Sequence, residues 1–123
     1  MKVITLKQPW ATLIAEGYKK YEFRSWKTLY RGELYIHAGK GVDKKAMKKL
    51  EHLNLEFPQS KILAKVTLKD CIKLDEDLGN EIHNKNKLIY GNHPDGYAWL
   101  LDDVVKIDNH KTLNGKLGLW NLD

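Results

Sequence analysis

The sequence contains a single cysteine, Cys71, and its five histidines are scattered along the chain. One cysteine excludes a disulfide within the chain and any zinc site built from several thiolates. No His-Glu-x-x-His pair occurs, so the histidines lack the spacing that holds a catalytic zinc ion on a helix. We therefore expect no metal ion and no other cofactor. Cys71 stands among strand-like apolar residues and is interpreted as a small buried hydrophobe.

Long hydrophobic runs are missing too. None approaches the roughly 20 apolar residues that cross a membrane as a helix, and the apolar stretch after Met1 is too short for the core of a signal peptide. These absences predict a protein of the cytoplasm without a membrane partner. The length of 123 residues and the globular composition predict a single domain over residues 1–123.

Two common catalytic motifs are also absent. The segment Gly39, Lys40 and Gly41 lacks both the spacing and the Ser or Thr of a phosphate-binding loop. No Gly-x-Ser-x-Gly segment occurs, which is the turn that carries the nucleophile of α/β-hydrolases. The sequence therefore gives no indication of a nucleoside triphosphatase or of a serine hydrolase.

Positive charge is distributed unevenly along the chain. The formal net charge is +5 at pH 7, and residues 1–60 hold 12 basic and 6 acidic side chains. Both arginines, Arg24 and Arg31, also lie in this half. An excess of basic residues in one half of a chain favours a polyanionic partner, most often a nucleic acid, although lysine-rich surfaces can also serve solubility alone.

Hydrophobic periodicity predicts a short helix near the N-terminus. The helix is expected to start at Pro9, because proline fits the first helical turn, where its missing N–H is not needed. Trp10, Leu13 and Ile14 follow the helical spacing and predict one buried face. Gly17 is expected to end the helix, since glycine adopts the left-handed conformation at low cost.

A second amphipathic helix is expected over residues 42–53. Its outer face carries Lys44, Lys45, Lys48 and His52, opposite an apolar face. This basic face is predicted to add charge to a nucleic-acid surface without adding specificity, or else to be an ordinary solvated face.

Period-2 alternation and β-branched residues predict six or seven short strands. They cover residues 3–6, 18–26, 33–38, 62–68, 97–101, 104–107 and 117–122. The glycines after the third strand are expected to end it, residues 75–83 are weakly helical, and residues 84–95 are expected to form a loop. Many short strands with two or three short helices predict an α+β, mainly β fold in which a curved mixed sheet closes into a small β-barrel.

A short segment after the first helix combines lysine, carboxylate, arginine and tryptophan. On a strand, Tyr21 and Phe23 would point toward the core, and Glu22, Arg24 and Trp26 toward the other side. A carboxylate two residues before an arginine can fix the guanidinium for binding a phosphate or a base edge. The same two residues can also form a simple surface ion pair, worth about 0–1 kcal/mol.

These residues carry a resemblance to a known family. Gly17, Lys19, Glu22 and Arg24 match the Gly-x-Lys-x-x-Glu-x-Arg signature of the ASCH domain, which is named after the activating signal cointegrator 1 protein. Further matches are Gln-Pro-Trp-Ala at residues 8–11, Arg-Ser-Trp at 24–26, Arg-Gly-Glu-Leu at 31–34 and Leu-Trp-Asn-Leu at 119–122. The resemblance spans nearly the whole chain, which is identified as a member of this family.

The resemblance implies a fold similar to PUA domains, which is a small β-barrel with flanking helices and a cleft between the barrel and the first helix. It also implies action on RNA or nucleotides. The family includes binding modules, short bacterial N4-acetylcytidine amidohydrolases and proteins to which ribonuclease activity is ascribed. The resemblance implies that the amidohydrolases use a lysine, a threonine and a glutamate, with the lysine at the position of Lys19. This chain departs from that arrangement, because Glu22 stands where the threonine is expected.

The first functional hypothesis is a domain that binds RNA or a modified nucleotide, with DNA as a further candidate partner. In it, Arg24 contacts the phosphate or base edge, Lys19 is a second cation at the mouth of the cleft, and Trp26 stacks on a base. The candidate binding residues share polar, charged or aromatic side chains in the first 40 residues. They are Gln8, Lys19, Glu22, Arg24, Trp26, Arg31 and Lys40.

The second hypothesis is a small metal-independent hydrolase of a nucleoside amide or an RNA phosphodiester, with Lys19 as the catalytic base and Glu22 as its partner. Lysine acts as a base only if burial or a neighbouring cation lowers its pKa, whereas Glu22 would favour the charged form. A regular strand would also place Lys19 on the face opposite Glu22, so the two meet only if the chain after Gly17 is irregular. A third hypothesis is a protein-interaction domain whose cleft has lost its ligand.

Overall fold

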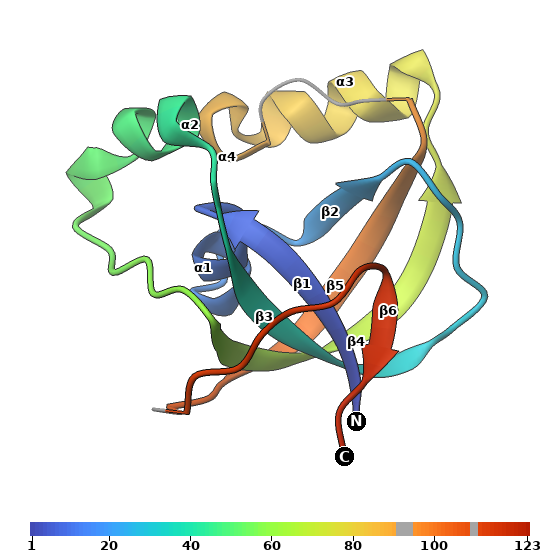
Figure 1. The fold of residues 1–123 in the computed structure, drawn as a ribbon. Helices are drawn as coiled ribbons and strands as arrows, with labels where there is room; N and C mark the ends of the chain where they lie inside the picture. The colour runs from blue at the N-terminus through green and yellow to red at the C-terminus, as the bar shows by residue number, and fades with distance from the viewer. Residues whose placement is uncertain (91–94, 109–110) are drawn as a thin grey trace.

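The structure, a computed structural model, describes residues 1–90, 95–108 and 111–123. These residues form one six-stranded sheet with the strand order β2-β5-β4-β3-β1-β6 (Figure 1). The strands are β1 (Lys2–Gln8), β2 (Tyr21–Arg24), β3 (Gly32–Val42), β4 (Lys61–Lys73), β5 (Tyr97–Lys106) and β6 (Leu119–Asn121). β1 and β3 run parallel, and the other neighbouring strands are antiparallel. The predicted mixed sheet is therefore confirmed.

Short helices flank this sheet. In the described part of the chain they are α1 (Trp10–Ala15), α2 (Lys44–Lys49), a 3₁₀ turn η1 (Glu51–Leu53), α3 (Glu76–Lys85) and α4 (Lys87–Tyr90). Figure 1 shows α2, α4 and α3 in a row along one end of the sheet, with α1 next to β1. No helix among the described residues combines the length and the apolar character needed to span a membrane.

Two hydrophobic clusters hold the helices to the sheet. The first joins α1, through Ala11 and Ile14, to β1, β3, β4 and β5. The second joins Leu13 on another side of α1 to Leu50, at the end of α2, and to Ile82 of α3. The predicted first helix is thus confirmed, and its burial extends beyond one face because it lies between the two clusters.

The aromatic residues of β2 face the second cluster. Tyr21 and Phe23 pack against it together with Trp10 and Leu13, as predicted, but both β2 residues are only partly buried. Ile14 belongs to the first cluster instead. β2 is an edge strand and has a neighbouring strand, β5, on one side only.

The closed barrel is a wrong prediction. β2 has four residues instead of nine and pairs with β5 alone, so β2 and β6 remain the two edges of the sheet. β2 starts late because the backbone N–H groups of Tyr18 and Lys19 both donate to the carbonyl oxygen of Leu13, at 2.9 and 3.1 Å. A side chain links β2 to β1, which has no backbone pairing with it, since Nη2 of Arg24 donates to the carbonyl oxygen of Thr5 in β1 at 3.0 Å.

Four strands, β1, β3, β4 and β5, are longer than predicted. β3 continues past Gly39 and Gly41 because Gln8 of β1 still pairs with Val42 at its end. The two segments predicted on either side of an aspartate turn form one strand, β5, in which Asp103 has a φ of 54° and the pairing with β4 shifts its register. A local irregularity within a strand therefore replaces both predicted interruptions.

The predicted helix at 42–53 is divided into α2 and η1. Asp43 caps α2, because its Oδ1 accepts a hydrogen bond from the backbone N–H of Ala46 at 3.1 Å. The predicted loop at 84–95 is wrong in its first part, which contains the end of α3 and all of α4; residues 91–94 lie outside the described residues. Cys71 is partly buried against the first cluster.

Candidate functional site

Lys19 is positioned by the end of α1. Gly17 follows the helix with a φ of 83°, which glycine adopts at little steric cost, and the next two residues turn back to hydrogen-bond Leu13. The regular strand begins only at Tyr21, so Lys19 does not follow the alternation of a strand. Its Nζ lies 3.9 Å from Oε1 of Glu22. The irregularity that the hydrolase hypothesis requires is present.

Three aromatic rings surround the ammonium group of Lys19. Their centroids lie 5.2 Å (Trp10), 5.0 Å (Phe23) and 4.9 Å (Tyr90) from Nζ, within the range of cation–π contacts. Lys19 is only 3% exposed. This burial lowers the pKa of the Lys19 ammonium, against the opposing effect of the Glu22 carboxylate. Lys19 therefore stands behind a wall of rings, which corrects its expected place at the mouth of a cleft.

Glu22 links the two cations of the signature. Its Oε2 lies 3.5 Å from Nε of Arg24, and the residue is 8% exposed. Nε of Arg24 has no hydrogen-bond partner among the described residues, so this contact is an ion pair rather than a hydrogen bond. The guanidinium is held at Nη2 by the carbonyl oxygen of Thr5. About a quarter of the Arg24 side chain, 26%, stays exposed, although Nε itself is buried.

Sequence reasoning missed Tyr90 and Thr5. The Tyr90 hydroxyl accepts a hydrogen bond from the backbone N–H of Lys20 at 2.9 Å, and its ring packs edge-on against Tyr21. This contact joins residues 70 positions apart, and no pattern along the chain connects them. Thr5 supports Arg24 with a backbone oxygen, which every residue carries, so its identity gives no signal.

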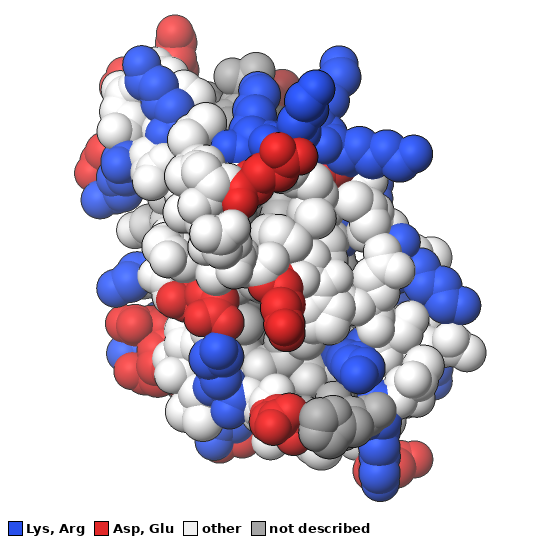
Figure 2. Space-filling view, turned by 90° about the vertical axis from the view of Figure 1, so that its left-hand side faces the viewer, with Lys and Arg blue, Asp and Glu red and all other residues white. Residues whose placement is uncertain are grey.

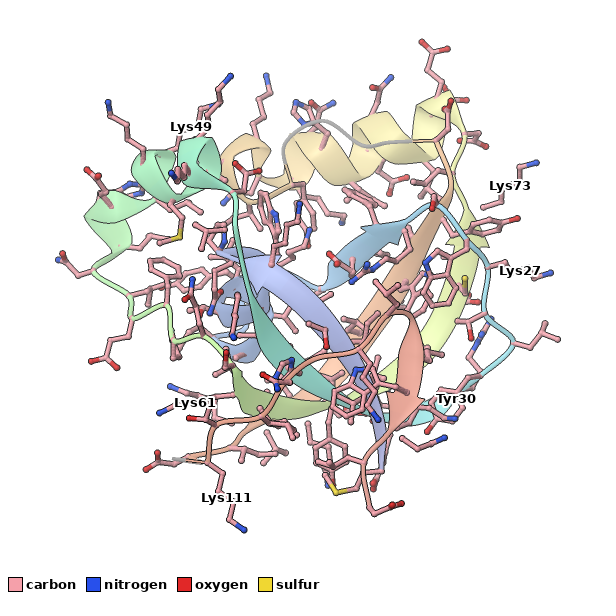
Figure 3. The ribbon with its side chains drawn as sticks, in the orientation of Figure 1. Lys27, Tyr30, Lys49, Lys61, Lys73 and Lys111 are labelled. Atoms are coloured by element: carbon pink, nitrogen blue, oxygen red, sulfur yellow. The ribbon has the colours of Figure 1, made fainter. Side chains whose placement is uncertain are left out.

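A cavity of about 640 Å³ lies outside the aromatic wall. Its lining is aromatic and basic and includes Trp10, Asp43, Lys45, Ala46, Lys49, His83, Lys87, Leu88 and Tyr90. The carboxylate of this lining, Asp43, already caps α2. Figure 2 shows basic side chains gathered at the end of the molecule where α2 lies, and in Figure 3 Lys49 projects from α2 away from the sheet. Trp10 and Tyr90 thus separate the buried Lys19 from a lysine-rich surface.

Gln8 is completely buried beneath α1. Its Nε2 donates to Oγ1 of Thr12 at 2.8 Å and to the carbonyl oxygen of Pro58 at 2.7 Å. Its Oε1 accepts a hydrogen bond from the backbone N–H of Thr12 at 3.0 Å. Both amide hydrogens are used within the protein, so Gln8 joins α1 to the chain before β4 and has no donor left for a ligand.

Three other candidates have separate surroundings. Trp26 packs edge-on against Trp99, with ring centroids 4.8 Å apart. Arg31 donates to two backbone carbonyl oxygens of its own turn and lies 3.5 Å from Asp70 of β4. Lys40 lines a different pocket, at the end of β3. Within the described ranges no contact joins Arg31 or Lys40 to the Lys19, Glu22 and Arg24 row, which we call the signature row.

The described residues contain no group of three or more His, Cys, Asp or Glu side chains that could hold a metal ion. His93 and His110 lie outside the described ranges. The signature row consists of an amine, a carboxylate and a guanidinium with aromatic neighbours. Such groups can bind an anion, stack on a base or transfer a proton.

Comparison with known proteins places these residues in a family. The model of the ASCH domain matches residues 4–108. Activating signal cointegrator 1 from Mus musculus is 35% identical over 81 residues, which are 56% of this chain and 14% of that protein. Its counterpart from Homo sapiens is 49% identical over 35 residues, which are 28% of this chain and 6% of that protein. The chain thus matches only a small part of these longer relatives.

Solved structures show the same fold. A mutant of the ASCH protein of Zymomonas mobilis superposes with a TM-score of 0.59 at 19% sequence identity, over 92% of this chain and 74% of that one. The structure of the ASCH protein of that organism without a stated mutation gives a TM-score of 0.57 at 19% identity, over 92% and 72% of the two chains. At this identity the likeness concerns the arrangement of the backbone.

Proposed function

The chain belongs to the ASCH domain family, and from this premise we propose that it binds RNA or a modified nucleotide at a cleft around the signature row. One observation carries the proposal: the buried Glu22 carboxylate pairs with Lys19 on one oxygen and with Arg24 on the other. Two cations held by one carboxylate keep their orientation before any ligand arrives, and preorganised donors bind anions with less entropic cost.

Arg24 is the residue of the row that contacts the ligand in this proposal. Its guanidinium is planar and is already anchored through Nη2, so the remaining N–H groups have a fixed direction. Phosphate oxygens and the edges of bases are acceptors that match such a group. Lys19 acts from behind the aromatic wall, where its charge adds to the positive field of the site.

In this proposal the lysines around the 640 Å³ cavity attract the RNA phosphates, and this attraction does not depend on the RNA sequence. Lys45, Lys49 and Lys87 line the cavity next to Trp10, which is partly exposed, so phosphates and a base stacked on Trp10 can be accommodated side by side. This combination of cations and aromatic rings favours single-stranded or modified RNA over an acidic protein, because an acidic peptide does not need a stacking surface.

Titration of a labelled single-stranded RNA with the full chain tests the proposal. Arg24→Ala and Arg24→Lys should both weaken binding by about ten- to a hundredfold, since lysine keeps the charge but cannot be held at Thr5 and Glu22 together. Lys73→Gln is the matched control, because Lys73 is exposed at the far end of β4 and projects into solvent (Figure 3). Loss of affinity in the control equal to that in Arg24→Lys would refute a specific role of Arg24.

A second function has one observation in its favour, which is that burial lowers the pKa of the Lys19 amine. A neutral Lys19 can accept a proton from water, and the water oxygen then attacks the acetyl carbon of N4-acetylcytidine. The bond between that carbon and N4 breaks, N4 takes the proton, and cytidine and acetate leave. Water is the nucleophile in this scheme because Glu22 stands where the related amidohydrolases are expected to have a threonine hydroxyl.

Lys19→Arg separates the two functions. Arginine keeps the positive charge but does not release its proton near neutral pH, so RNA affinity should persist and any turnover should disappear. Turnover by the unmodified chain, without added metal, should rise with pH as the Lys19 ammonium loses its proton. Turnover that survives in Lys19→Arg would exclude Lys19 as the base, and absence of both RNA binding and turnover would favour a protein-interaction domain.

A further inference from the structure

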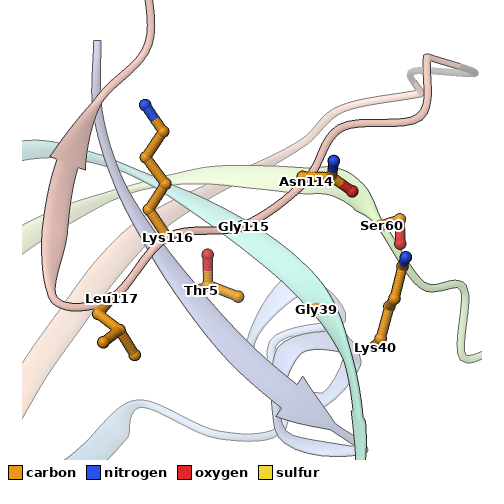
Figure 4. A pocket seen from close by; sticks show the side chains of 8 residues that line it. All are labelled: Thr5, Gly39, Lys40, Ser60, Asn114, Gly115, Lys116 and Leu117. Carbon is orange, nitrogen blue, oxygen red and sulfur yellow. The ribbon is translucent and has the colours of Figure 1, made fainter.

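A second pocket, distinct from the signature row, lies at the end of β3 (Figure 4). It has a volume of about 560 Å³, within the range of small-molecule sites. Eight residues line it: Thr5, Gly39, Lys40, Ser60, Asn114, Gly115, Lys116 and Leu117. Two of these residues are lysines and none is acidic, so the lining carries an excess positive charge without a built-in counterion.

One wall of this pocket is the segment that leads to β6, and a chain of hydrogen bonds holds it. His37 is fully buried, and its Nε2 lies 2.6 Å from the carbonyl oxygen of Leu113, so Nε2 must carry a proton. Burial lowers the pKa of His37, and its Nδ1 then accepts from Oγ1 of Thr5 at 3.1 Å. That oxygen in turn accepts from Nε1 of Trp120 at 3.1 Å. The wall is therefore fixed in place, and the Thr5 hydroxyl is already used.

Two glycines let the backbone of the pocket lining approach Thr5 closely. A Cβ atom at Gly39 would lie 2.8 Å from the Thr5 side chain, and one at Gly115 would lie 2.6 Å from it. Only residues without a side chain allow the two backbones to approach Thr5 so closely. In the described part of the chain, none of residues 114–117, which line the pocket, donates its backbone N–H to another backbone group.

The side chains that remain for a ligand are donors. Figure 4 shows the Lys40 amine on the same side of the pocket as the Ser60 hydroxyl and the Asn114 amide. Ser60 is held in place with a φ of 58°, and its carbonyl oxygen accepts from the backbone N–H of Leu113 at 2.8 Å. Lys116 lies at the other end, with its Nζ 5.7 Å from the centre of the Trp120 ring. These groups come from three segments far apart in sequence.

We propose that this pocket binds a phosphate monoester, either of a free mononucleotide or of the end of an RNA strand. A monoester carries close to two negative charges and three acceptor oxygens at neutral pH. An ammonium, a hydroxyl, a side-chain amide and backbone N–H groups are complementary to it. The lining has no aromatic ring, so the phosphate, rather than the base, determines binding. The proposal assigns Lys40 to this second site and does not depend on the signature row.

NMR titration of the full chain tests the proposal with three probes: inorganic phosphate, adenosine 5′-monophosphate and adenosine. We expect saturable shifts of the amides around Lys40, Ser60 and residues 114–117 with the two phosphates and none with adenosine. Lys40→Gln and Ser60→Gly should each weaken phosphate binding by about tenfold; glycine accepts the positive φ of that position. Lys73→Gln serves as the control with the same change of charge and should bind as the unmodified chain does.

The two sources of the monoester are distinguished with an RNA oligonucleotide that carries either a 5′-phosphate or a 5′-hydroxyl. A preference for the phosphorylated strand that Lys40→Gln removes identifies an RNA end, and equal binding of both strands, with retained binding of the mononucleotide, identifies a free nucleotide. Equal shifts with adenosine and its monophosphate would overturn the proposal. The proposal would also be overturned if Lys73→Gln lost as much phosphate binding as Lys40→Gln. It would be overturned as well if neither phosphate bound saturably.

Discussion

At Lys19, two opposing influences act on one ammonium group. Burial among three rings removes water from the charge, while Glu22 at 3.9 Å stabilises it, and the net effect lowers the pKa of Lys19. The cation–π contacts with the rings return part of the lost hydration energy. The position is therefore a compromise in stability, which is common where a group serves a function.

A stability measurement over pH detects this compromise. The pKa of Lys19 is lower in the folded than in the unfolded chain, whose value is near 10.5, so the unfolded chain binds more protons between the two values. The contribution of Lys19 to the free energy of unfolding should rise with pH up to about 10.5. Lys19→Met should remove this rise, as measured by urea unfolding at a series of pH values.

Lys73→Met is the control for this series, because Lys73 is exposed. It should retain the dependence on pH of the unmodified chain. Identical profiles of Lys19→Met and the unmodified chain would mean that Lys19 titrates alike in the folded and unfolded states.

Some residues of the site could be predicted from the sequence and others could not. Lys19, Glu22 and Arg24 lie within six positions, so a local motif was sufficient to single them out. Gln8 belonged to the same motif region, but its amide is used inside the protein. Tyr90 joins the row through a contact across 70 positions, which only folding establishes.

The elements show the same contrast. α1 was predictable because apolar spacing, proline and glycine agree on it within nine residues. β2 was predicted too long because apolar alternation continued through residues whose backbone donors bind the end of α1 instead. α4 has four residues, too few for a helical period to become visible in the sequence.

The basic side of α2 allows a prediction about its own contribution to binding. Lys44, Lys45 and Lys48 are exposed, and Figure 2 shows basic side chains gathered at this end of the molecule. Their joint replacement by Gln should weaken binding of all RNA sequences alike and make the dependence of log affinity on log salt shallower by up to about 3 units. Affinity measured at several salt concentrations checks this.

A matched comparison uses lysines of other elements. Joint replacement of Lys27, Lys73 and Lys111 by Gln removes the same charge from places that Figure 3 shows well away from α2. An equal change of the salt slope in both triple variants would indicate that only the net charge matters, and an unchanged slope in the α2 variant would place the phosphate contacts elsewhere.

At the scale of the whole molecule, Arg24 has a structural role as well, because the sheet is open. β2 and β1 have no backbone pairing, and the hydrogen bond from Arg24 to Thr5 crosses between them. Sequence analysis predicted the curvature of a barrel but not this opening, because closure depends on the length of β2. The residue that faces the ligand in our proposal therefore also links the edge strand β2 to β1.

Arg24→Ala should accordingly lower the free energy of unfolding by about 1–3 kcal/mol, since a charged hydrogen bond is lost and Glu22 keeps only Lys19 as its partner. Hydrogen exchange should increase first in β2. Urea unfolding together with exchange measurements checks both effects. A loss of RNA affinity without any change in stability or exchange would show that the contact to Thr5 does not contribute to folding.

The place of β1 has a consequence for how the chain folds during its synthesis. Val3 pairs with Tyr35 on one side and with Trp120 on the other, so β1, the first of the described strands, is completed by β6, the last of them. Until β6 emerges, one edge of β1 stays unpaired, and contacts between such distant segments form slowly. We expect this part of the nascent chain to stay open to proteases and chaperones until β6 has left the ribosome.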